Sequence, residues 1–335
     1  MIAYRRLLLN AVSLVPGAAQ FPLVRRRLRN RVTGTGGSIS ASYCYSVWLR
    51  HLVLAREHGL DADPKDVAEL GPGDSIGVGL AALLCGAERY RALDVVRHAN
   101  HEVNLRIFDQ LVDMFRRREE IPDSPTLHPK LASYRFPHLI LTAERLARAL
   151  DPGRLARLRQ AVAAGDAAPS DAIRYCVPWS DEAVLPPASQ HVVFSQAVLE
   201  HVDALPQAYR AMRRWLKPGG YISHQVDFKS HGWGGGTWDG HWRHGDWYWK
   251  ALRGRDSWFI NREPYSVHLR LLEETGFRRV HTQTVEAAPT YERRLLAPRF
   301  MSMPDEDRHT AGAYLLAVVA PKGLAGAAEL RAGKP

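Results

Sequence analysis

The chain has 335 residues, which is enough for one large domain or two domains of ordinary size. Its 46% apolar and 24% charged residues are ordinary for a soluble globular protein, and no apolar run reaches the roughly 18 residues that a membrane-spanning helix needs. The net charge of +10 would suit an anionic partner such as nucleic acid or a lipid surface. Only seven of the 45 basic residues are lysine, however, and an arginine excess beside abundant alanine also fits biased coding, so the charge identifies no partner.

Residues 1–65 are expected to form a basic helical N-terminal extension. The apolar stretch near its start is interrupted by Asn10 and Ser13 and followed by Pro16, which disfavours a signal peptide. Two interpretations of the first thirty residues remain open. We favour a helix packed on the main domain over a basic amphipathic segment in weak peripheral contact with the inner face of a membrane.

The three cysteines, Cys44, Cys85 and Cys176, are odd in number and lack the spacing of metal ligands. They favour buried free thiols in a reducing compartment, so we expect a cytoplasmic protein.

Residues 66–94 carry the strongest local pattern, a strand, a glycine-rich turn, a helix and a second strand. Residues 66–70 are an apolar run, residues 76–84 are helix formers and small residues, and residues 90–93 are a second strand that ends in Asp94. This order predicts one βαβ unit with an acidic residue at each strand end.

The turn of this unit favours a cationic nucleoside as its ligand. Gly71 and Gly73 allow a sharp turn and close approach to a ligand, and Asp94 follows at about the spacing at which an acid meets ribose hydroxyls. Ile76 stands where a dinucleotide motif has its third glycine, and Glu69 before the turn would repel a phosphate. Both features argue against NAD.

Residues 69–75, which read E-L-G-P-G-D-S, resemble the first motif of class I S-adenosylmethionine (SAM) dependent methyltransferases, with Ser75 where many members have a third glycine. The resemblance implies that Glu69 lies near the amino group of the methionine moiety, that the turn passes beneath the cofactor and that Asp94 holds the ribose. The expected SAM contacts here are Glu69, Gly71, Pro72, Gly73, Asp74, Ser75, Asp94 and Val95. An unrelated α/β protein with a glycine-rich loop is the alternative for this motif alone.

A helix is predicted at residues 43–58, and helices before the first strand commonly cover the cofactor in proteins that resemble this family. Its polar and aromatic residues are therefore candidates for ligand contact, although core packing is the default for most of them: Tyr43, Tyr45, Trp48, Arg50 and His51.

Residues 95–172 are expected to form a helical insertion that sits over the sheet and helps to shape the substrate pocket. His128, Arg135 and His138 lie on its least regular part, where function more often resides, but each is more often a packing or surface residue.

A second motif spans residues 191–227. A buried strand near residues 191–194 leads into V-L-E-H-V, then a helix that L-K-P-G-G ends, then a strand at residues 221–227. Its order and spacing resemble the fourth strand, helix and fifth strand of small-molecule class I methyltransferases. Ser195 and Gln196, after the fourth strand, are then expected at the ligand site and are added to the cofactor contacts.

The third strand, residues 173–177, lacks the acid and small residue that grip adenine in many similar proteins. Val177 and Pro178 stand there instead, and Asp181 is the expected substitute.

Residues 228–262 form a predicted lid rich in tryptophan and histidine. Three interpretations remain open: the aromatic faces stack on a sugar or other flat acceptor, which we favour; the aromatics are a structural cover of the pocket; or His224, Asp227 and His231 bind a metal. A strand places His224 and Asp227 on opposite faces, so no metal is expected. Five of its tryptophans crowd around a glycine-rich hinge: Trp233, Trp238, Trp242, Trp247 and Trp249.

The catalytic candidates lie at the end of the fifth strand and in the lid. For a hydroxyl acceptor the base should have a pKa near the working pH, which favours histidine. His231 is the first choice, with Asp227 as its orienter or as an alternate base and His224 as a further candidate.

A helix with a serine cap at residues 266–275 and strands at residues 278–285 and 313–319 complete the fold. We predict a Rossmann-like, doubly wound α/β domain at residues 66–321. Its mostly parallel seven-stranded sheet has an antiparallel last strand, and a flexible tail follows at residues 322–335.

The predicted function is SAM-dependent methyl transfer to a small-molecule or glycan acceptor at oxygen, without specific nucleic-acid binding. The alternatives are a nicotinamide-dependent oxidoreductase, a nucleic-acid methyltransferase and a binding protein without turnover. The place after the fourth strand where base-amine methyltransferases often have N-P-P-Y or D-P-P-Y holds S-Q-A-V here, at residues 195–198.

Overall fold

A computed structural model describes residues 37–96, 98–165, 170–179, 181–254 and 259–320. Most of the predicted N-terminal extension and the predicted tail lie outside these residues. Within them, no helix has the length and apolar character needed to cross a bilayer.

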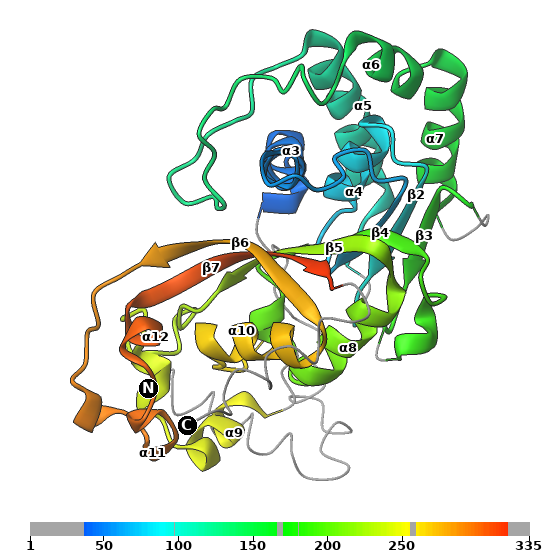
Figure 1. Ribbon diagram of the computed structural model, residues 1–335. Coiled ribbons are helices and arrows are strands. Elements are labelled where there is room, and N and C mark those ends of the chain that lie inside the picture. Colours follow the sequence, from blue (N-terminus) through cyan, green and yellow to red (C-terminus); the bar gives the residue numbers. More distant parts are fainter. Residues whose placement is uncertain (1–36, 97, 166–169, 180, 255–258, 321–335) are drawn as a thin grey trace, which may run out of the picture.

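One seven-stranded sheet runs through the molecule in the order β3-β2-β1-β4-β5-β7-β6 (Figure 1). The strands are β1 (Asp66–Leu70), β2 (Arg89–Leu93), β3 (Ile173–Cys176), β4 (Gln190–Gln196), β5 (Leu216–Asp227), β6 (Phe277–Glu286) and β7 (Thr310–Val319). The pairs from β3 to β5 are parallel, and β7 is antiparallel to both of its neighbours. The predicted doubly wound, mostly parallel sheet with an antiparallel last strand is confirmed.

Helices cover both faces of the sheet (Figure 1). One face carries α3 (Ala41–Glu57), α4 (Gly77–Leu84), α5 (His101–Arg117), α6 (Ala143–Ala149) and α7 (Pro152–Ala164). The other carries α8 (Leu205–Trp215) and α10 (Tyr265–Glu274). The short helices α9 (Asp246–Arg253), α11 (Pro298–Met301) and α12 (Asp305–His309) lie toward the β6 and β7 end.

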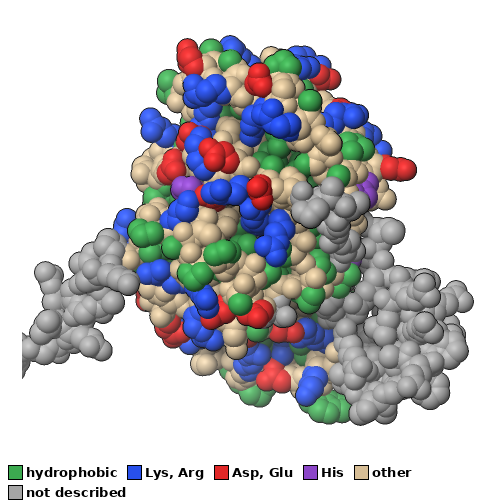
Figure 2. Space-filling model, turned by 90° about the vertical axis from the view of Figure 1, so that its right-hand side faces the viewer, with side chains coloured by type: hydrophobic (Ala, Val, Ile, Leu, Met, Phe, Trp, Pro, Cys, Tyr) green, Lys and Arg blue, Asp and Glu red, His purple; other side chains and the backbone are tan. Residues whose placement is uncertain are grey.

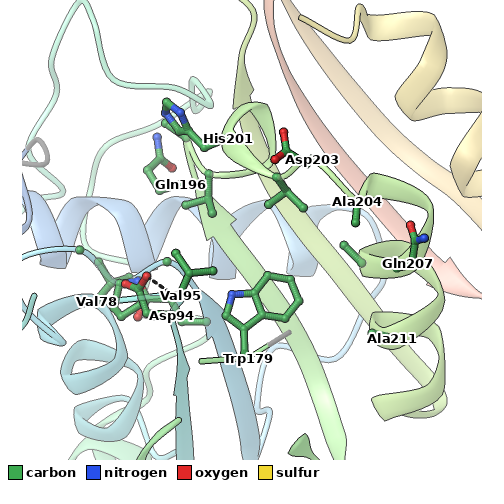
Figure 3. A pocket seen from close by; sticks show the side chains of 18 of the residues that line it. Val78, Asp94, Val95, Trp179, Gln196, His201, Asp203, Ala204, Gln207 and Ala211 are labelled. Carbon is green, nitrogen blue, oxygen red and sulfur yellow. Dashed lines mark hydrogen bonds between the residues drawn. The ribbon is translucent and has the colours of Figure 1, made fainter. Parts of the chain in front are cut away.

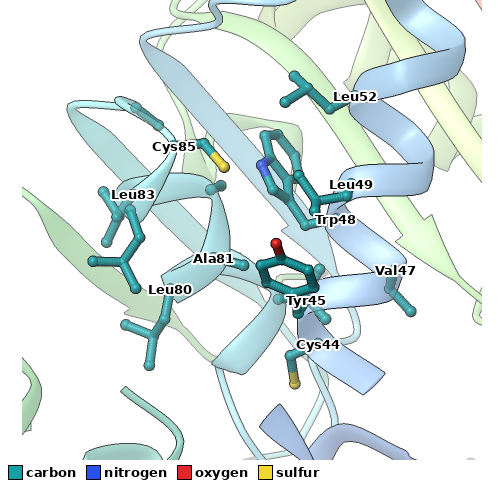
Figure 4. Packing of buried hydrophobic residues seen from close by; sticks show 14 of the residues in the cluster. Cys44, Tyr45, Val47, Trp48, Leu49, Leu52, Leu80, Ala81, Leu83 and Cys85 are labelled. Atoms are coloured by element: carbon teal, nitrogen blue, oxygen red, sulfur yellow. The ribbon is translucent and has the colours of Figure 1, made fainter. Parts of the chain in front are cut away.

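Two apolar cores follow from this layering, one on each face. On the first face, Trp48 and Leu49 of α3 pack against Leu80 and Ala81 of α4 (Figure 4). Gly79 lets α4 lie close to the sheet, since a Cβ there would lie 2.0 Å from the Tyr90 ring. The α3–α4 pair thus fixes the strand ends of β1 and β2 against which a ligand would rest.

Two local expectations are wrong. Ser266 does not cap α10, because that helix starts at Tyr265 and the Ser266 hydroxyl donates to Asp307 (2.6 Å) instead. The chain also enters β5 directly at Leu216, with a register irregularity opposite Gln190, rather than after the glycine pair.

Candidate active site

A cavity of about 600 Å³ opens at the carboxyl ends of β1, β2 and β4, where open α/β sheets bind ligands. Figure 3 shows Asp94, Val95 and Trp179 on one side of it and Asp203, Ala204 and Gln207 toward α8. The wall is mostly apolar, and the described charged groups that line it come from the strand ends and the α8 side. We call this space the cofactor cavity.

The glycine-rich turn forms the floor of the cofactor cavity. Gly71 (φ +61°) and Gly73 (φ +73°) both have left-handed backbone conformations, which favour glycine. A Cβ on Gly71 would also lie 2.7 Å from a Val198 methyl group, so this glycine brings the turn against the segment after β4. Gly71, Pro72 and Gly73 all line the cavity, as predicted.

Asp74 and Ser75 do not line the cofactor cavity. The structure therefore gives no support to their predicted contacts with SAM. The Ser75 hydroxyl is fully buried and donates to the Ser38 carbonyl, and the Asp74 amide donates to the Ser38 hydroxyl (3.1 Å). Both residues instead attach the turn to the short 3-10 helix Gly37–Ile39.

Glu69 is buried at the end of β1 and lines the cofactor cavity. Burial raises the pKa of its carboxyl to about 8, against the opposing hydrogen bond from the Tyr90 hydroxyl. The nearby Asp94 carboxylate raises this pKa further. A cation beside Glu69 would favour its charged form, so the residue is suited to a positively charged ligand.

Asp94 presents an unsatisfied oxygen to the same cavity. Its Oδ1 accepts the Val95 amide (2.7 Å; Figure 3), whereas its buried Oδ2 has no hydrogen-bond partner. Burial raises the pKa of this carboxyl as well. A buried acceptor without a partner costs free energy, and ribose hydroxyls are donors that would satisfy it.

These residues fit SAM, because the cavity combines two buried carboxylates, a floor without side chains and apolar walls. The described residues that would flank a flat base are Val95, half exposed, and Trp179, nearly buried. Trp179 was missed by the sequence reasoning, although its position soon after the third strand was a usable signal. Asp181 lines the cavity where a substitute adenine contact was expected.

Ser195 and His224 lie in the core rather than at the ligand site. The Ser195 hydroxyl and His224 Nδ1 are 2.7 Å apart, and His224 Nε2 lies 3.1 Å from the Met212 sulfur on the α8 side of the sheet. Burial lowers the pKa of the fully enclosed His224 ring to about 3. The structure therefore gives no support to His224 as a catalytic residue or to Ser195 as a cofactor contact.

A second cavity of about 450 Å³ adjoins the first, and the two share Tyr43, Gln196 and Ala197 in their walls. Most of the residues that line the second cavity have polar side chains, and it is enclosed by the start of α3, the irregular residues 122–128 and residues of β5 and β7. We call it the polar cavity. Gln196, which the sequence predicts as a cofactor contact, thus lies at the boundary of the two cavities.

Asp227 lines the polar cavity at the end of β5. His231 Nε2 lies 3.4 Å from Asp227 Oδ2, and the Lys229 amide donates to Oδ1 (3.0 Å). Burial acts to raise the pKa of Asp227, but these partners outweigh it and lower the pKa overall, so the carboxylate stays ionised. The two predicted catalytic residues, Asp227 and His231, are brought together.

His201 connects this pair to the cofactor cavity, which it lines. Its ring centroid lies 5.2 Å from that of His231. His201 belongs to the V-L-E-H-V motif, but the sequence did not mark it as a site residue.

Among the described tryptophans of residues 228–262, none lines either cavity, so the predicted stacking lid has no support in this structure. Trp242 donates to the Arg262 carbonyl (3.1 Å) and Trp249 to the Ile260 carbonyl (3.2 Å), and both are buried in two small apolar clusters. Arg262 lies over the Trp249 ring at 4.7 Å. The aromatics build a separate lobe, which agrees with a structural cover.

The candidates predicted on α3 and in the irregular part of residues 95–172 also divide into residues that line a cavity and residues that do not. Tyr43 lines both cavities and His128 lines the polar one, whereas Arg135 and His138 line neither. The remaining α3 candidates are buried in the core or in hydrogen bonds: Tyr45, Trp48, Arg50 and His51. Among the described residues no cluster of three or more His, Cys, Asp or Glu side chains is arranged to hold a metal, and the three cysteines are buried and form no disulfide.

Comparisons with known proteins agree with this geometry. Residues 146–223, from α6 into β5, match the profile of a family described as "Methyltransferase domain". The match begins after the glycine-rich turn, so the two signals come from different parts of the chain. A search of curated proteins finds no match.

Many solved structures are also similar to the chain, at low sequence identity. One is a SAM-dependent methyltransferase from Mesorhizobium loti (16% identity, 79% of this chain and 96% of that one, TM-score 0.37). A second is phosphoethanolamine N-methyltransferase 2 from Haemonchus contortus in complex with SAM (12%, 84% and 57%, TM-score 0.40). A third comes from the complex of the Haloferax volcanii Trm112 methyltransferase activator with a methyltransferase (16%, 84% and 94%, TM-score 0.39). At these scores the likenesses carry nothing about substrate.

Strand order and family match together confirm the predicted class. The protein has the fold and the domain signature of a class I methyltransferase, an enzyme that uses SAM as its cofactor. Neither the oxidoreductase nor the nucleic-acid alternative is favoured. On the face drawn in Figure 2, basic and acidic side chains are interspersed rather than gathered into one basic patch.

Proposed function

We propose that this protein transfers the methyl group of SAM to a hydroxyl oxygen of a small polar acceptor that binds in the polar cavity. The observation that carries the proposal is the shared wall of the two cavities at Tyr43, Gln196 and Ala197. A cofactor on the Gly71–Gly73 turn and an acceptor beside Asp227 would meet at this boundary. Positioning two reactants in this way supplies much of the rate of a methyl transfer.

The cofactor contacts proposed here are those that line the cavity. Glu69 binds the cationic methionine end, Asp94 Oδ2 accepts the ribose hydroxyls and Gly71, Pro72 and Gly73 support the nucleoside from below. Val95 and Trp179 exclude water from the base, and Gln196 lies at the meeting point with the acceptor. When bound, SAM supplies an electrophilic methyl group on a positively charged sulfur.

Asp227 and His231 handle the proton. In the transfer the carbon–sulfur bond breaks, a carbon–oxygen bond forms, and the acceptor hydroxyl must lose its proton. Asp227 faces the acceptor, accepts the hydrogen bond of its hydroxyl and relays the proton to His231, the general base, whose Nε2 lies 3.4 Å behind the carboxylate. A lowered pKa makes Asp227 itself a weak base, which favours histidine for this role.

The experiment is to incubate the protein with methyl-labelled SAM and fractionated cell extract. We expect label in a pool of small or sugar-containing molecules, as an ether-linked methyl group that survives mild alkali. Label confined to nucleic acid or protein, or no label at all, would contradict the proposal.

A further inference from the structure

The polar cavity has one wall without regular secondary structure, residues 122–129, which is held by its main chain. Arg50 of α3 is fully buried, and its guanidinium donates to the carbonyls of Pro122 (3.1 Å) and Pro129 (2.6 Å). The Ser46 hydroxyl donates to the same Pro122 carbonyl (2.7 Å). A wall fixed through its carbonyls has a conformation that depends little on its own side chains, which are then available to face a ligand.

Two other elements fasten the same segment. Gln196 Nε2, at the end of β4, donates to the His128 carbonyl (3.0 Å). Gln283 of β6 exchanges hydrogen bonds with the main chain of Lys130. The cavity is therefore built before any acceptor arrives.

The charged groups around the polar cavity are already compensated. Asp123 lies 3.3 Å from Arg50 and 3.8 Å from Lys130. Asp227 lies 3.4 Å from both Lys229 and His231. Burying a charged ligand beside paired charges gains little and costs desolvation, so the lining favours a neutral polar ligand.

Two buried amide oxygens of residues that line this cavity have no hydrogen-bond partner, those of Gln196 and Gln225. Gln225 lines the cavity with only 6% of its surface exposed, and its Nε2 donates to the Val226 carbonyl (3.1 Å), while its Oε1 has no hydrogen-bond partner. Asp227 follows two residues later on the same face of β5, about 7 Å along the strand. Both side chains line the same cavity from one face of the strand.

We propose that the acceptor is a neutral polyhydroxylated molecule with vicinal hydroxyl groups, of the sugar or cyclitol class, whose hydroxyls donate to Gln225 and Asp227. This inference rests on the proposed function. A molecule with several adjacent hydroxyls satisfies both acceptors at once and brings no charge, and the serine and threonine hydroxyls of the wall can bond to its remaining oxygens: Ser42, Ser124 and Thr126.

The test uses periodate, which cleaves the carbon–carbon bond between two hydroxyl-bearing carbons to give two carbonyls and is itself reduced to iodate. One half of a cell extract is treated with periodate, the excess is destroyed with ethylene glycol, and both halves are incubated with the full-length protein and labelled SAM. We expect treatment to abolish the labelling seen in the untreated half. Labelling that survives would overturn this inference alone, whereas no label in either half would overturn the proposed function as well.

A substitution at Gln225 tests whether this residue binds the acceptor. Gln225→Leu removes the free acceptor at nearly constant shape and should lower labelling at limiting extract roughly three- to tenfold, the equivalent of one hydrogen bond. SAM affinity, measured by calorimetry, should be unchanged. Gln110→Leu on the exposed side of α5 is the matched control. Equal labelling by the Gln225 variant and the control would contradict the role of Gln225 and the acceptor chemistry deduced from it.

Discussion

The two cavities differ in how the chain builds them. The cofactor cavity takes its two buried carboxylates and its floor from one βαβ unit, residues 66–94, whereas the polar cavity is assembled from the start of α3, residues 122–128 and residues of β5 and β7. The cofactor cavity is mostly apolar and has two buried carboxylates. Most residues that line the polar cavity have polar side chains, and its charged side chains are paired. The comparison teaches that cofactor binding depends on local sequence and acceptor binding on tertiary arrangement.

The largest expected effect separates catalysis from cofactor binding. Asp227→Asn keeps the size of the side chain but removes the charge that orients the acceptor and stabilises protonated His231. We expect kcat to fall by about 10²- to 10⁴-fold, the range for general acid–base groups, with SAM affinity unchanged. Rates of label transfer and calorimetry measure the two quantities. The control is Asp113→Asn on the exposed face of α5, and equal activity of the two variants would exclude the assigned role.

A glycine pair tests whether the floor of the cofactor cavity requires the absence of a side chain. Gly71→Ala and Gly219→Ala both place a Cβ at positive φ, which costs about 1–2 kcal/mol of unfolding free energy. Only at Gly71 does the new methyl meet a neighbour, since nothing lies within 4 Å of the Gly219 position. We expect a urea titration to show a larger loss for Gly71→Ala, and calorimetry to show weaker SAM binding for that variant alone. Equal losses of unfolding free energy in the two variants would contradict the close contact between Gly71 and Val198.

The pH dependence of SAM binding tests the charge of the cofactor cavity. Burial raises the pKa of Glu69 from 4.5 to about 8, so the folded protein without ligand keeps a proton there that the unfolded chain has lost. Stability of the free protein should therefore fall as pH rises from about 5 to 8, by up to about 1.4 kcal/mol per pH unit. SAM affinity should rise over pH 6 to 8, because the cation favours the ionised carboxyl, and binding should release a proton.

Calorimetry in buffers of different ionisation enthalpy measures that proton. Glu69→Gln should abolish the release and flatten the pH slope of stability, whereas Glu88→Gln at an exposed position should change neither. Proton release that persists in Glu69→Gln would assign it to another group.

The smallest effect is expected in the tryptophan-rich lobe. Trp247 is 81% exposed, so Trp247→Ala should change stability by no more than about 0.5 kcal/mol and leave methyl transfer unchanged. Trp249 is 5% exposed, and Trp249→Ala should cost about 3–5 kcal/mol. A large loss of activity in a stable Trp247→Ala variant would restore the stacking lid that the structure does not support.

The sequence predicted the parts of the molecule that depend on neighbouring residues. The βαβ unit, the mostly parallel sheet with its antiparallel last strand and the places of Glu69, Gly71 and Asp94 follow from local spacing and a resemblance. Ser75 was misplaced because its hydroxyl bonds to Ser38, far away in the sequence. The sequence left the role of the tryptophans open, because aromatic composition does not reveal whether rings pack on a ligand or on each other.

The roles of Gln225 and of the cavity wall that Arg50 holds were not predicted either, because both depend on residues that are distant in the sequence. Gln225 follows Ser223 and His224 in a run of polar residues within a mostly buried strand, and its free oxygen becomes apparent only when β7 and residues 122–128 enclose it. Arg50 was weighed as a ligand contact, but its bonds run to carbonyls more than seventy residues away.

The most direct test of the central claim is a calorimetric titration of the protein with SAM, beside the Asp94→Asn variant. The account predicts one-site binding by the unaltered protein and a roughly ten- to hundredfold weaker affinity in the variant, which loses charge-assisted hydrogen bonds to the ribose. No binding by the unaltered protein, or equal affinity in the variant, would contradict it.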